Sequence, residues 1–209
     1  MKPIETLMRT APVIPVLVIH DPAEALPVAR ALVAGGLTVL EVTLRTPAAE
    51  QVIRAMSQVE GAIVGAGTVV DERTLDVALD AGAQFIVSPG LTEPLGKAAL
   101  AAGVPFLPGV ATAGDIMRGL DLGLTHFKFF PAMAAGGIPA LKSLADPFAM
   151  CRFCPTGGIS LETAPDWLAM EPVLCVGGSW VTGKGPADSA RIEAAARQAA
   201  SLPRASQKP

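Results

Sequence analysis

The sequence is poor in charge: only 17% of its 209 residues are Asp, Glu, Lys or Arg, whereas 51% are hydrophobic. So little charge with so much apolar material excludes disorder for most of the chain and favours a large core. The net charge is −3, so the sequence lacks the basic surplus that binds nucleic acid or an acidic membrane surface. We therefore expect a globular protein that takes a small-molecule substrate and binds no nucleic acid and no membrane.

A membrane-spanning segment is also missing. The longest uncharged run, residues 98–114, is interrupted by proline and glycine, and it is shorter than the roughly 18 apolar residues that a spanning helix needs. The apolar run at residues 13–19 could suggest a signal peptide, but Glu5 precedes it and Pro15 interrupts it. We interpret that run as a strand, and we expect a cytoplasmic protein.

Cysteine and histidine are scarce, with three and two residues respectively. Three cysteines form no even disulfide set, and Cys151 and Cys154 have no second pair to complete a zinc site. Neither His20 nor His126 stands at ligand spacing from other His, Cys or carboxylate residues. Residues 65–68 (GAGT) lack the third glycine of a dinucleotide-binding motif. We expect buried free thiols, no metal and no cofactor.

What the sequence does contain is an eightfold alternation of strand and helix patterns. Short apolar runs with strand character begin near residues 13, 39, 62, 84, 106, 125, 151 and 173. Alanine-rich stretches between and after them predict helices at residues 22–34, 47–58, 71–81, 92–101, 112–122, 138–144, 160–168 and 187–201. Strands that alternate with helices pair in parallel.

An open, doubly wound sheet and a closed barrel both fit such an alternation. The eightfold count and the uniform composition favour the closed barrel. We therefore predict an α/β fold, a single compact (β/α)8 TIM barrel. We expect this domain to span residues 1–202 and to be followed by a disordered tail at residues 203–209.

The second predicted strand carries a carboxylate and a guanidinium on one face. Glu41, Thr43 and Arg45 share that face because strand side chains alternate. A carboxylate in the middle of a parallel strand is costly unless it is paired or functional. A structural pair between Glu41 and Arg45 would explain it, but reactive groups of a barrel collect at the C-terminal ends of strands. The position therefore favours a catalytic role.

The sixth predicted strand places Lys128 among Phe127, Phe129 and Phe130. Burial there disfavours the ammonium form, and a nearby guanidinium such as that of Arg45 would disfavour it further. A neutral lysine amine is the nucleophile that Schiff-base chemistry requires. A lysine at the strand rim that extends into water fits the pattern equally well.

Paired glycines follow the last two predicted strands, each just before a predicted helix. They are Gly157 and Gly158 after the seventh strand, and residues 177–178, followed by Ser179, after the eighth. Loops at these two places form the usual phosphate site of a barrel, where backbone N–H groups and a helix N-terminus bind the anion. Glycine pairs can simply serve tight turns, but their presence at both places favours a phosphate site.

Six ordered segments stand at or near the strand ends: EVTLRT at 41–46, GAGTV at 65–69, VSPG at 87–90, FKFFPA at 127–132, PTGGI at 155–159 and GGSW at 177–180. Taken together, they resemble the KDPG aldolase family, whose members are class I aldolases of the Entner–Doudoroff pathway. The resemblance runs from about residue 8 to residue 200 and implies a compact, cofactor-free (β/α)8 barrel that assembles as a homotrimer.

This resemblance implies a role for individual residues. Lys128 would be the Schiff-base lysine and Glu41 the general acid/base, while Arg45 and Thr68 would hold the substrate carboxylate. The remaining implied residues are the pocket residues Pro89, Phe130 and Thr156 and the phosphate-binding residues Gly157, Gly158 and Ser179. Met133 stands where the family commonly has glutamate, which puts a local loop contact in doubt but none of these roles.

The implied reaction is cleavage of 2-dehydro-3-deoxy-6-phosphogluconate (KDPG) to pyruvate and glyceraldehyde 3-phosphate. We also expect cleavage of 4-hydroxy-2-oxoglutarate (KHG) to pyruvate and glyoxylate. One alternative is an aldolase for 2-dehydro-3-deoxy-6-phosphogalactonate. Another is a phosphosugar isomerase or epimerase, in which Glu41 would transfer protons and Lys128 would act only through its charge. The combination of Glu41 and Lys128 argues against a non-catalytic binding protein.

Overall fold

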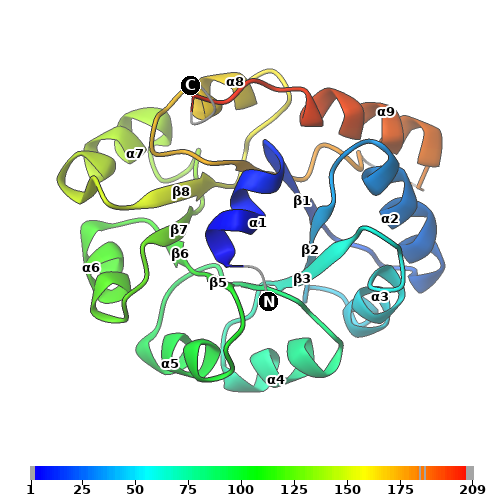
Figure 1. Ribbon diagram of the computed structural model, residues 1–209, viewed down its shortest axis with the longest axis horizontal. Helices are drawn as coiled ribbons and strands as arrows, with labels where there is room; N and C mark the ends of the chain where they lie inside the picture. The colour runs from blue at the N-terminus through cyan, green and yellow to red at the C-terminus, as the bar shows by residue number, and fades with distance from the viewer. Residues whose placement is uncertain (1–2, 184, 186, 206–209) are drawn as a thin grey trace.

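The computed structural model describes residues 3–183, 185 and 187–205. Strands surround the centre of the molecule and helices lie outside them (Figure 1). The strands are β1 (Val13–Leu17), β2 (Val39–Thr43), β3 (Ile63–Gly67), β4 (Ile86–Val87), β5 (Phe106–Leu107), β6 (Gly109–Val110), β7 (His126–Phe129), β8 (Arg152–Pro155) and β9 (Val176–Gly178). The α-helices are α1 (Ile4–Thr10), α2 (Ala25–Ala34), α3 (Ala49–Met56), α4 (Glu72–Asp80), α5 (Glu93–Ala101), α6 (Ala113–Asp121), α7 (Gly137–Ala145), α8 (Ala164–Leu168) and α9 (Ser189–Ala200).

The strands form two parallel sheets, and this corrects the predicted closed eight-stranded (β/α)8 TIM barrel. Six strands pair in the order β5-β4-β3-β2-β1-β9, and three pair in the order β6-β7-β8. One break falls inside the fifth predicted strand, where Pro108, which has no N–H to donate, separates β5 from β6. At the other break, between β8 and β9, isolated bridges join Phe153 to Val173 and Thr156 to Gly177.

Side-chain caps fix the start of three successive helices. α4, α5 and α6 follow Asp71, Thr92 and Thr112, whose side-chain oxygens accept hydrogen bonds from backbone N–H groups in the first turn. These helices follow β3, β4 and β6 in the chain, so the caps set where the chain turns back after each strand.

The helix α1 closes one end of the ring of strands. In Figure 1 it lies across the centre of the ring. Its residues Leu7 and Met8 are 2% and 0% exposed and pack with inward-facing side chains such as Phe85, Val87 and Leu107. The outward-facing side chains of the strands pack against the surrounding helices in a separate, larger cluster. α1 lies at the end where the strands begin, since Glu5 of α1 approaches His126, the first residue of β7.

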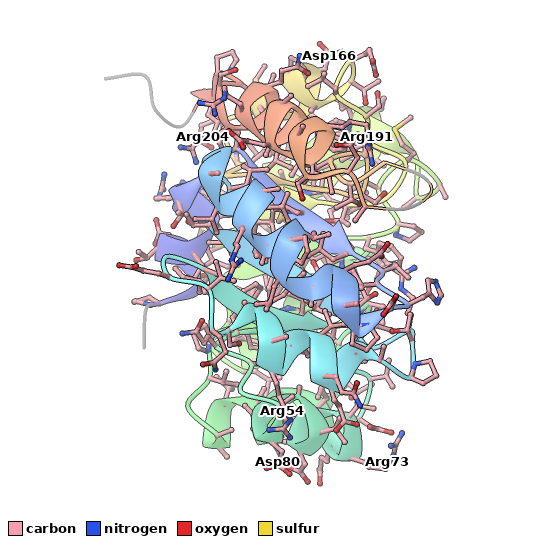
Figure 2. All side chains as sticks on the ribbon, turned by 90° about the vertical axis from the view of Figure 1, so that its right-hand side faces the viewer. Arg54, Arg73, Asp80, Asp166, Arg191 and Arg204 are labelled. Carbon is pink, nitrogen blue, oxygen red and sulfur yellow. The ribbon has the colours of Figure 1, made fainter. Side chains whose placement is uncertain are left out.

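The N-terminal and C-terminal parts of the chain pack against each other at two places. α2 and α9 lie side by side on the outside of the molecule (Figure 2). Gly35, at the end of α2, leaves the space that Ala196 of α9 fills. Beyond α9, the buried Arg204 donates a 2.9 Å hydrogen bond from Nη1 to the backbone oxygen of Arg9, in the last turn of α1.

The extent of the single domain, residues 1–202, stays a prediction. Of the predicted tail, residues 203–205 are described and include the anchored Arg204. Residues 206–209 lie outside the described residues. Among the helices in the described part of the chain, none has both the length and the apolar character needed to span a membrane.

Candidate active site

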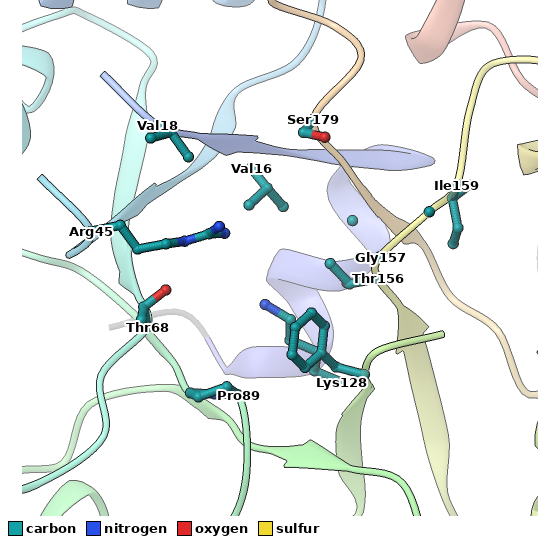
Figure 3. Close-up of a pocket in the computed structure, with 13 residues that line it drawn as sticks. Val16, Val18, Arg45, Thr68, Pro89, Lys128, Thr156, Gly157, Ile159 and Ser179 are labelled. Atoms are coloured by element: carbon teal, nitrogen blue, oxygen red, sulfur yellow. The ribbon is translucent and has the colours of Figure 1, made fainter. Parts of the chain in front are cut away.

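A cavity of about 470 Å3 lies at the C-terminal ends of the strands, away from α1 (Figure 3). It gathers all the predicted site residues except Glu41, which lies next to it. The predicted residues that line it are Arg45, Thr68, Pro89, Lys128, Phe130, Thr156, Gly157, Gly158 and Ser179. Four further residues, Val16, Val18, Ile159 and Gly177, complete the lining.

Lys128 is buried at the inner side of this cavity, with 5% of the residue exposed. It belongs to β7, where the alternation of side chains sends Phe127 and Phe129 outward to the helices and Lys128 inward. Its Nζ lies 5.2 Å from the centre of the Phe130 ring. The rim position that the sequence left open is therefore excluded for Lys128.

Glu41 pairs with Lys128 across the ring. Lys128 Nζ donates a 3.1 Å hydrogen bond to Glu41 Oε1, although the two residues come from β7 and β2. Glu41 is 3% exposed, so both charged groups are almost completely removed from water. Such a pair is costly to bury unless its geometry is good, and removing one partner leaves the other buried without a counter-charge.

Arg45 extends over the cavity from the opposite wall, and its guanidinium points into the cavity (Figure 3). The carboxylate of Glu41 thus pairs with Lys128 and not with Arg45, whose guanidinium forms no ion pair with any carboxylate of the described residues. Two hydroxyl groups fix the backbone on either side of Arg45. Thr43 Oγ1 donates to the backbone oxygen of Leu17 at 2.9 Å, and Thr46 Oγ1 donates to that of Ile19 at 2.7 Å.

Thr68 lines the cavity with a strained backbone. Its φ is +64°, in the left-handed region that a β-branched residue rarely adopts. Figure 3 shows its hydroxyl directed toward the cavity. Strained residues of this kind cluster at functional sites, where the surrounding structure holds them in place.

The glycine loop after β8 was predicted to bind a phosphate through its backbone, and this role stays a prediction. Gly157 and Gly158 have φ values of +106° and +77°, a conformation that glycine adopts readily. Their N–H groups have no backbone acceptor among the described residues. Met133 lies against this loop: its N–H donates to the Gly157 oxygen at 3.1 Å, and a Cβ on Gly158 would lie 2.8 Å from its Cγ.

Helix N-termini do not directly follow the two glycine pairs, contrary to the prediction. After Gly158 the chain makes turns until α8 begins at Ala164, and α9 begins only at Ser189. The predicted phosphate site therefore depends on backbone N–H groups and on the hydroxyl of Ser179.

The three cysteines of the chain carry free thiols. Cys151, Cys154 and Cys175 are buried, and burial raises the pKa of Cys175 well above its usual range. In the part of the chain that the structure describes, no group of three or more His, Cys, Asp and Glu residues is arranged to hold a metal ion.

The cavity residues that the sequence analysis missed are apolar or have no side chain. Val16 lies beside Glu41 in the register of β1 with β2, so alternation along β1 would have assigned Val16 to the same inner face. Val18 and Ile159 lie beyond the ends of their strands, where alternation gives no signal. Gly177 carries no side chain whose chemistry could mark it.

Comparison with known proteins agrees with this geometry. The family model for KDPG and KHG aldolases matches residues 4–195. The 2-dehydro-3-deoxy-phosphogluconate aldolase of Zymomonas mobilis is 58% identical over 205 residues, which cover 98% of this chain and 99% of that protein. The KHG/KDPG aldolase of Escherichia coli is 53% identical over 186 residues, covering 88% and 86%.

Solved structures show the same similarity. The crystal structure of 2-keto-3-deoxy-6-phosphogluconate aldolase from Zymomonas mobilis has a TM-score of 0.97 at 58% identity and covers 98% of this chain and 99% of its own. The KDPG aldolase of Legionella pneumophila has a TM-score of 0.92 at 41% identity, covering 96% and 99%, and holds pyruvate captured as a covalent carbinolamine. The chain described here therefore belongs to the KDPG and KHG aldolase family.

Proposed function

We propose that the protein is a class I aldolase that cleaves KDPG to pyruvate and glyceraldehyde 3-phosphate. The observation that carries the proposal is the buried 3.1 Å contact between Lys128 Nζ and Glu41 Oε1 beside a cavity into which Arg45 points. The lyase activity predicted from the sequence is confirmed by two relatives, 58% and 52% identical to this chain, that are named 2-dehydro-3-deoxy-phosphogluconate aldolase. The roles of individual residues are our proposal.

The first step joins Lys128 to the substrate. Transfer of a proton from Nζ to Glu41 gives the neutral amine, which attacks the C2 ketone. A bond forms between Nζ and C2, the π bond of the carbonyl breaks, and the proton on Glu41 moves to the former carbonyl oxygen to give a carbinolamine. Loss of its hydroxyl as water gives a protonated imine. Glu41, whose Oε1 already contacts Nζ, can take the proton that the amine loses and return it to the departing hydroxyl.

The second step breaks the carbon chain. Glu41, directly or through a water molecule, removes the proton of the C4 hydroxyl, and the C3–C4 bond breaks. The bonding electrons move into the imine, so that C4 becomes the aldehyde of glyceraldehyde 3-phosphate and an enamine remains on Lys128. Protonation of the enamine at C3 and hydrolysis of the imine by water release pyruvate and the free amine.

The remaining residues orient the substrate. The Arg45 guanidinium and the Thr68 hydroxyl bind the carboxylate next to the ketone, since Arg is suited to carboxylates. Pro89, Phe130 and Thr156 form the walls, and the backbone of Gly157 and Gly158 together with Ser179 binds the distal phosphate. Holding both ends of the substrate fixes the reacting carbons against Lys128 and Glu41.

KHG is a second candidate substrate. An unphosphorylated 2-keto acid keeps every contact at the reacting end, because Lys128, Glu41, Arg45 and Thr68 are separate from the glycine loop. The relative from Escherichia coli is named for both substrates. An isomerase or epimerase gains no comparable support, because the relatives that cover almost the whole chain are aldolases.

We also propose that the protein works as a homotrimer in the cytoplasm. Exposed apolar side chains such as Leu100 and Met117, 44% and 57% exposed, are available for self-association. The three free thiols are typical of a reducing compartment.

The experiment that tests the proposed reaction is borohydride trapping. Sodium borohydride reduces an imine to a stable secondary amine, so treatment with pyruvate should add mass to the peptide that holds Lys128. Lys128→Arg should abolish both this label and KDPG cleavage, whereas Lys97→Arg, at an exposed position, should keep both. A folded wild-type protein that gains no pyruvate-dependent mass, or gains it on another lysine, would contradict the mechanism.

A further inference from the structure

Gly67 is the last residue of β3 and faces the inside of the ring. Ile63, Gly65 and Gly67 alternate with the outward-facing Val64 and Ala66, which belong to the outer core. In the register of β2 with β3, Gly67 lies beside Thr43, two residues beyond Glu41. The inner surface of β3 therefore has no side chain at the point where the cavity begins.

The space left by the missing side chain of Gly67 is filled by Glu41. A Cβ atom on Gly67 would lie 2.7 Å from Cγ and 2.8 Å from Cδ of Glu41, and closer still to Oε1. This Oε1 is the same oxygen that accepts the hydrogen bond from Lys128 Nζ. The carboxylate thus reaches Lys128 across the bare Cα of Gly67.

The backbone of Gly67 does not require glycine. Unlike Gly157 and Gly158, it is not among the residues with positive φ. Its carbonyl oxygen accepts a 2.8 Å hydrogen bond from the N–H of Leu44, and this bond does not depend on the side chain. An alanine would therefore fit the backbone, and its methyl group would compete for space with the end of a flexible side chain.

We propose that Gly67 is a positioning residue for the proton-transfer step, because it leaves the space that the Glu41 side chain occupies when its carboxylate contacts Lys128. The inference rests on the proposed function, in which Glu41 moves the proton of the C4 hydroxyl. A methyl group at residue 67 displaces Oε1, and a displacement of about 1 Å in a catalytic group can cost about 100-fold in rate.

The test combines Gly67→Ala with Glu41→Ala. We expect Gly67→Ala to keep the endpoint of pyruvate trapping on Lys128 and to lower kcat for KDPG cleavage by about 100-fold. Glu41→Ala should lower kcat by about 100-fold to 10,000-fold, the usual contribution of general acid–base catalysis. In the double variant we expect the rate of Glu41→Ala alone, because the carboxylate on which residue 67 acts is gone.

Thermal unfolding gives a second readout, independent of activity. Glu41→Ala removes the three atoms that lie nearest to the new methyl group, so Gly67→Ala should lower the melting temperature more in the wild-type background than in the Glu41→Ala background. Gly114→Ala is the matched control. A Cβ there meets its nearest atom, Thr112 Oγ1, at an ordinary 3.8 Å, so we expect its kinetics to be those of the wild type.

Several outcomes would overturn the role of Gly67. These are wild-type kcat in Gly67→Ala, additive losses in the double variant, or a double variant that fails to fold when Glu41→Ala folds. An increase in the pyruvate concentration needed for half-maximal trapping would move the effect to the neighbouring Thr68. Wild-type cleavage by Glu41→Ala would instead contradict the proposed role of Glu41, whatever Gly67→Ala does.

Discussion

Thr68 shows how the site holds a residue in a conformation that the residue alone disfavours. Its left-handed backbone, with φ at +64°, stores about 1–3 kcal/mol of strain. Gly67 before it ends β3 and Pro89 shares the same cavity wall. The backbone conformation that directs the Thr68 side chain to the cavity thus lowers the stability of the protein.

We therefore expect Thr68→Gly to raise the free energy of unfolding by about 1 kcal/mol, because relief of strain outweighs the freedom of about 0.5–1 kcal/mol that glycine adds to the unfolded chain. Loss of the hydroxyl that we propose binds the substrate carboxylate should raise KM by about 10-fold or more. Urea unfolding and steady-state kinetics measure the two effects. Thr68→Ser, which keeps the hydroxyl, should keep KM near the wild-type value, and a Thr68→Gly protein less stable than the wild type would refute the strain argument.

At the scale of residues, the sequence alone identifies candidate site residues when a charged side chain occurs in a strand that is otherwise apolar. Lys128 among phenylalanines and Glu41 in a buried strand both stand out in this way, and the structure brings them into contact. Gly67 gives no such signal, since what it contributes is empty space that only the three-dimensional arrangement reveals. The pairing of Glu41 with Lys128 rather than Arg45 was equally inaccessible, because β2 and β7 are far apart in the chain.

At the scale of elements, α1 is a short helix whose stability comes from packing. It has seven residues, too few to be stable alone, but Leu7 and Met8 fill the end of the ring. Met8→Ala should lower the free energy of unfolding by about 2–5 kcal/mol, as expected for a fully buried methionine. Met150→Ala, at a position 59% exposed, should change it by no more than about 0.5 kcal/mol. Equal losses in the two variants, measured by urea unfolding, would mean that α1 does not pack in solution as described.

The elements that could be predicted are those with a repeated pattern. All eight predicted strand regions contain strands, and their pairing is parallel. α1 was missed because seven residues are too few for a helical period to emerge. The prediction of a closed sheet was wrong. The apolar pattern of the fifth predicted strand continues through Pro108, whereas the pairing of the strands is interrupted there.

At the scale of the whole molecule, the burial of His126 at the start of β7 makes stability depend on pH. His126 Nε2 lies 3.5 Å from Glu5 Oε2 with 16% of its side chain exposed. Burial lowers the pKa of His126 below its usual range, an effect larger than the opposing attraction of the Glu5 carboxylate. The unfolded chain binds this proton at about pH 6.5, whereas the folded chain binds it only at lower pH. Between the two pKa values the unfolded state holds more protons. The contribution of neutral His126 to the free energy of unfolding is therefore complete above about pH 6.5 and decreases as the pH falls below that value.

We expect the free energy of unfolding to decrease from about pH 7.5 to about pH 5.5, and His126→Asn to reduce this slope. His20→Asn alters the other histidine of the sequence, which is exposed, and should keep the wild-type slope. Urea unfolding at each pH measures the dependence. An unchanged slope in His126→Asn would show that other groups cause it.

The closure of one end of the ring by α1 also dictates the order in which molecules move through the site. Lys128 is buried at the inner side of the cavity, while the glycine loop and Ser179 lie nearer its mouth. In the proposed reaction the aldehyde, which forms on the side of the glycine loop, therefore leaves first, and pyruvate, bonded to Lys128, leaves only after hydrolysis of the imine. In the reverse direction the proposed mechanism requires pyruvate to react with Lys128 before the aldehyde adds.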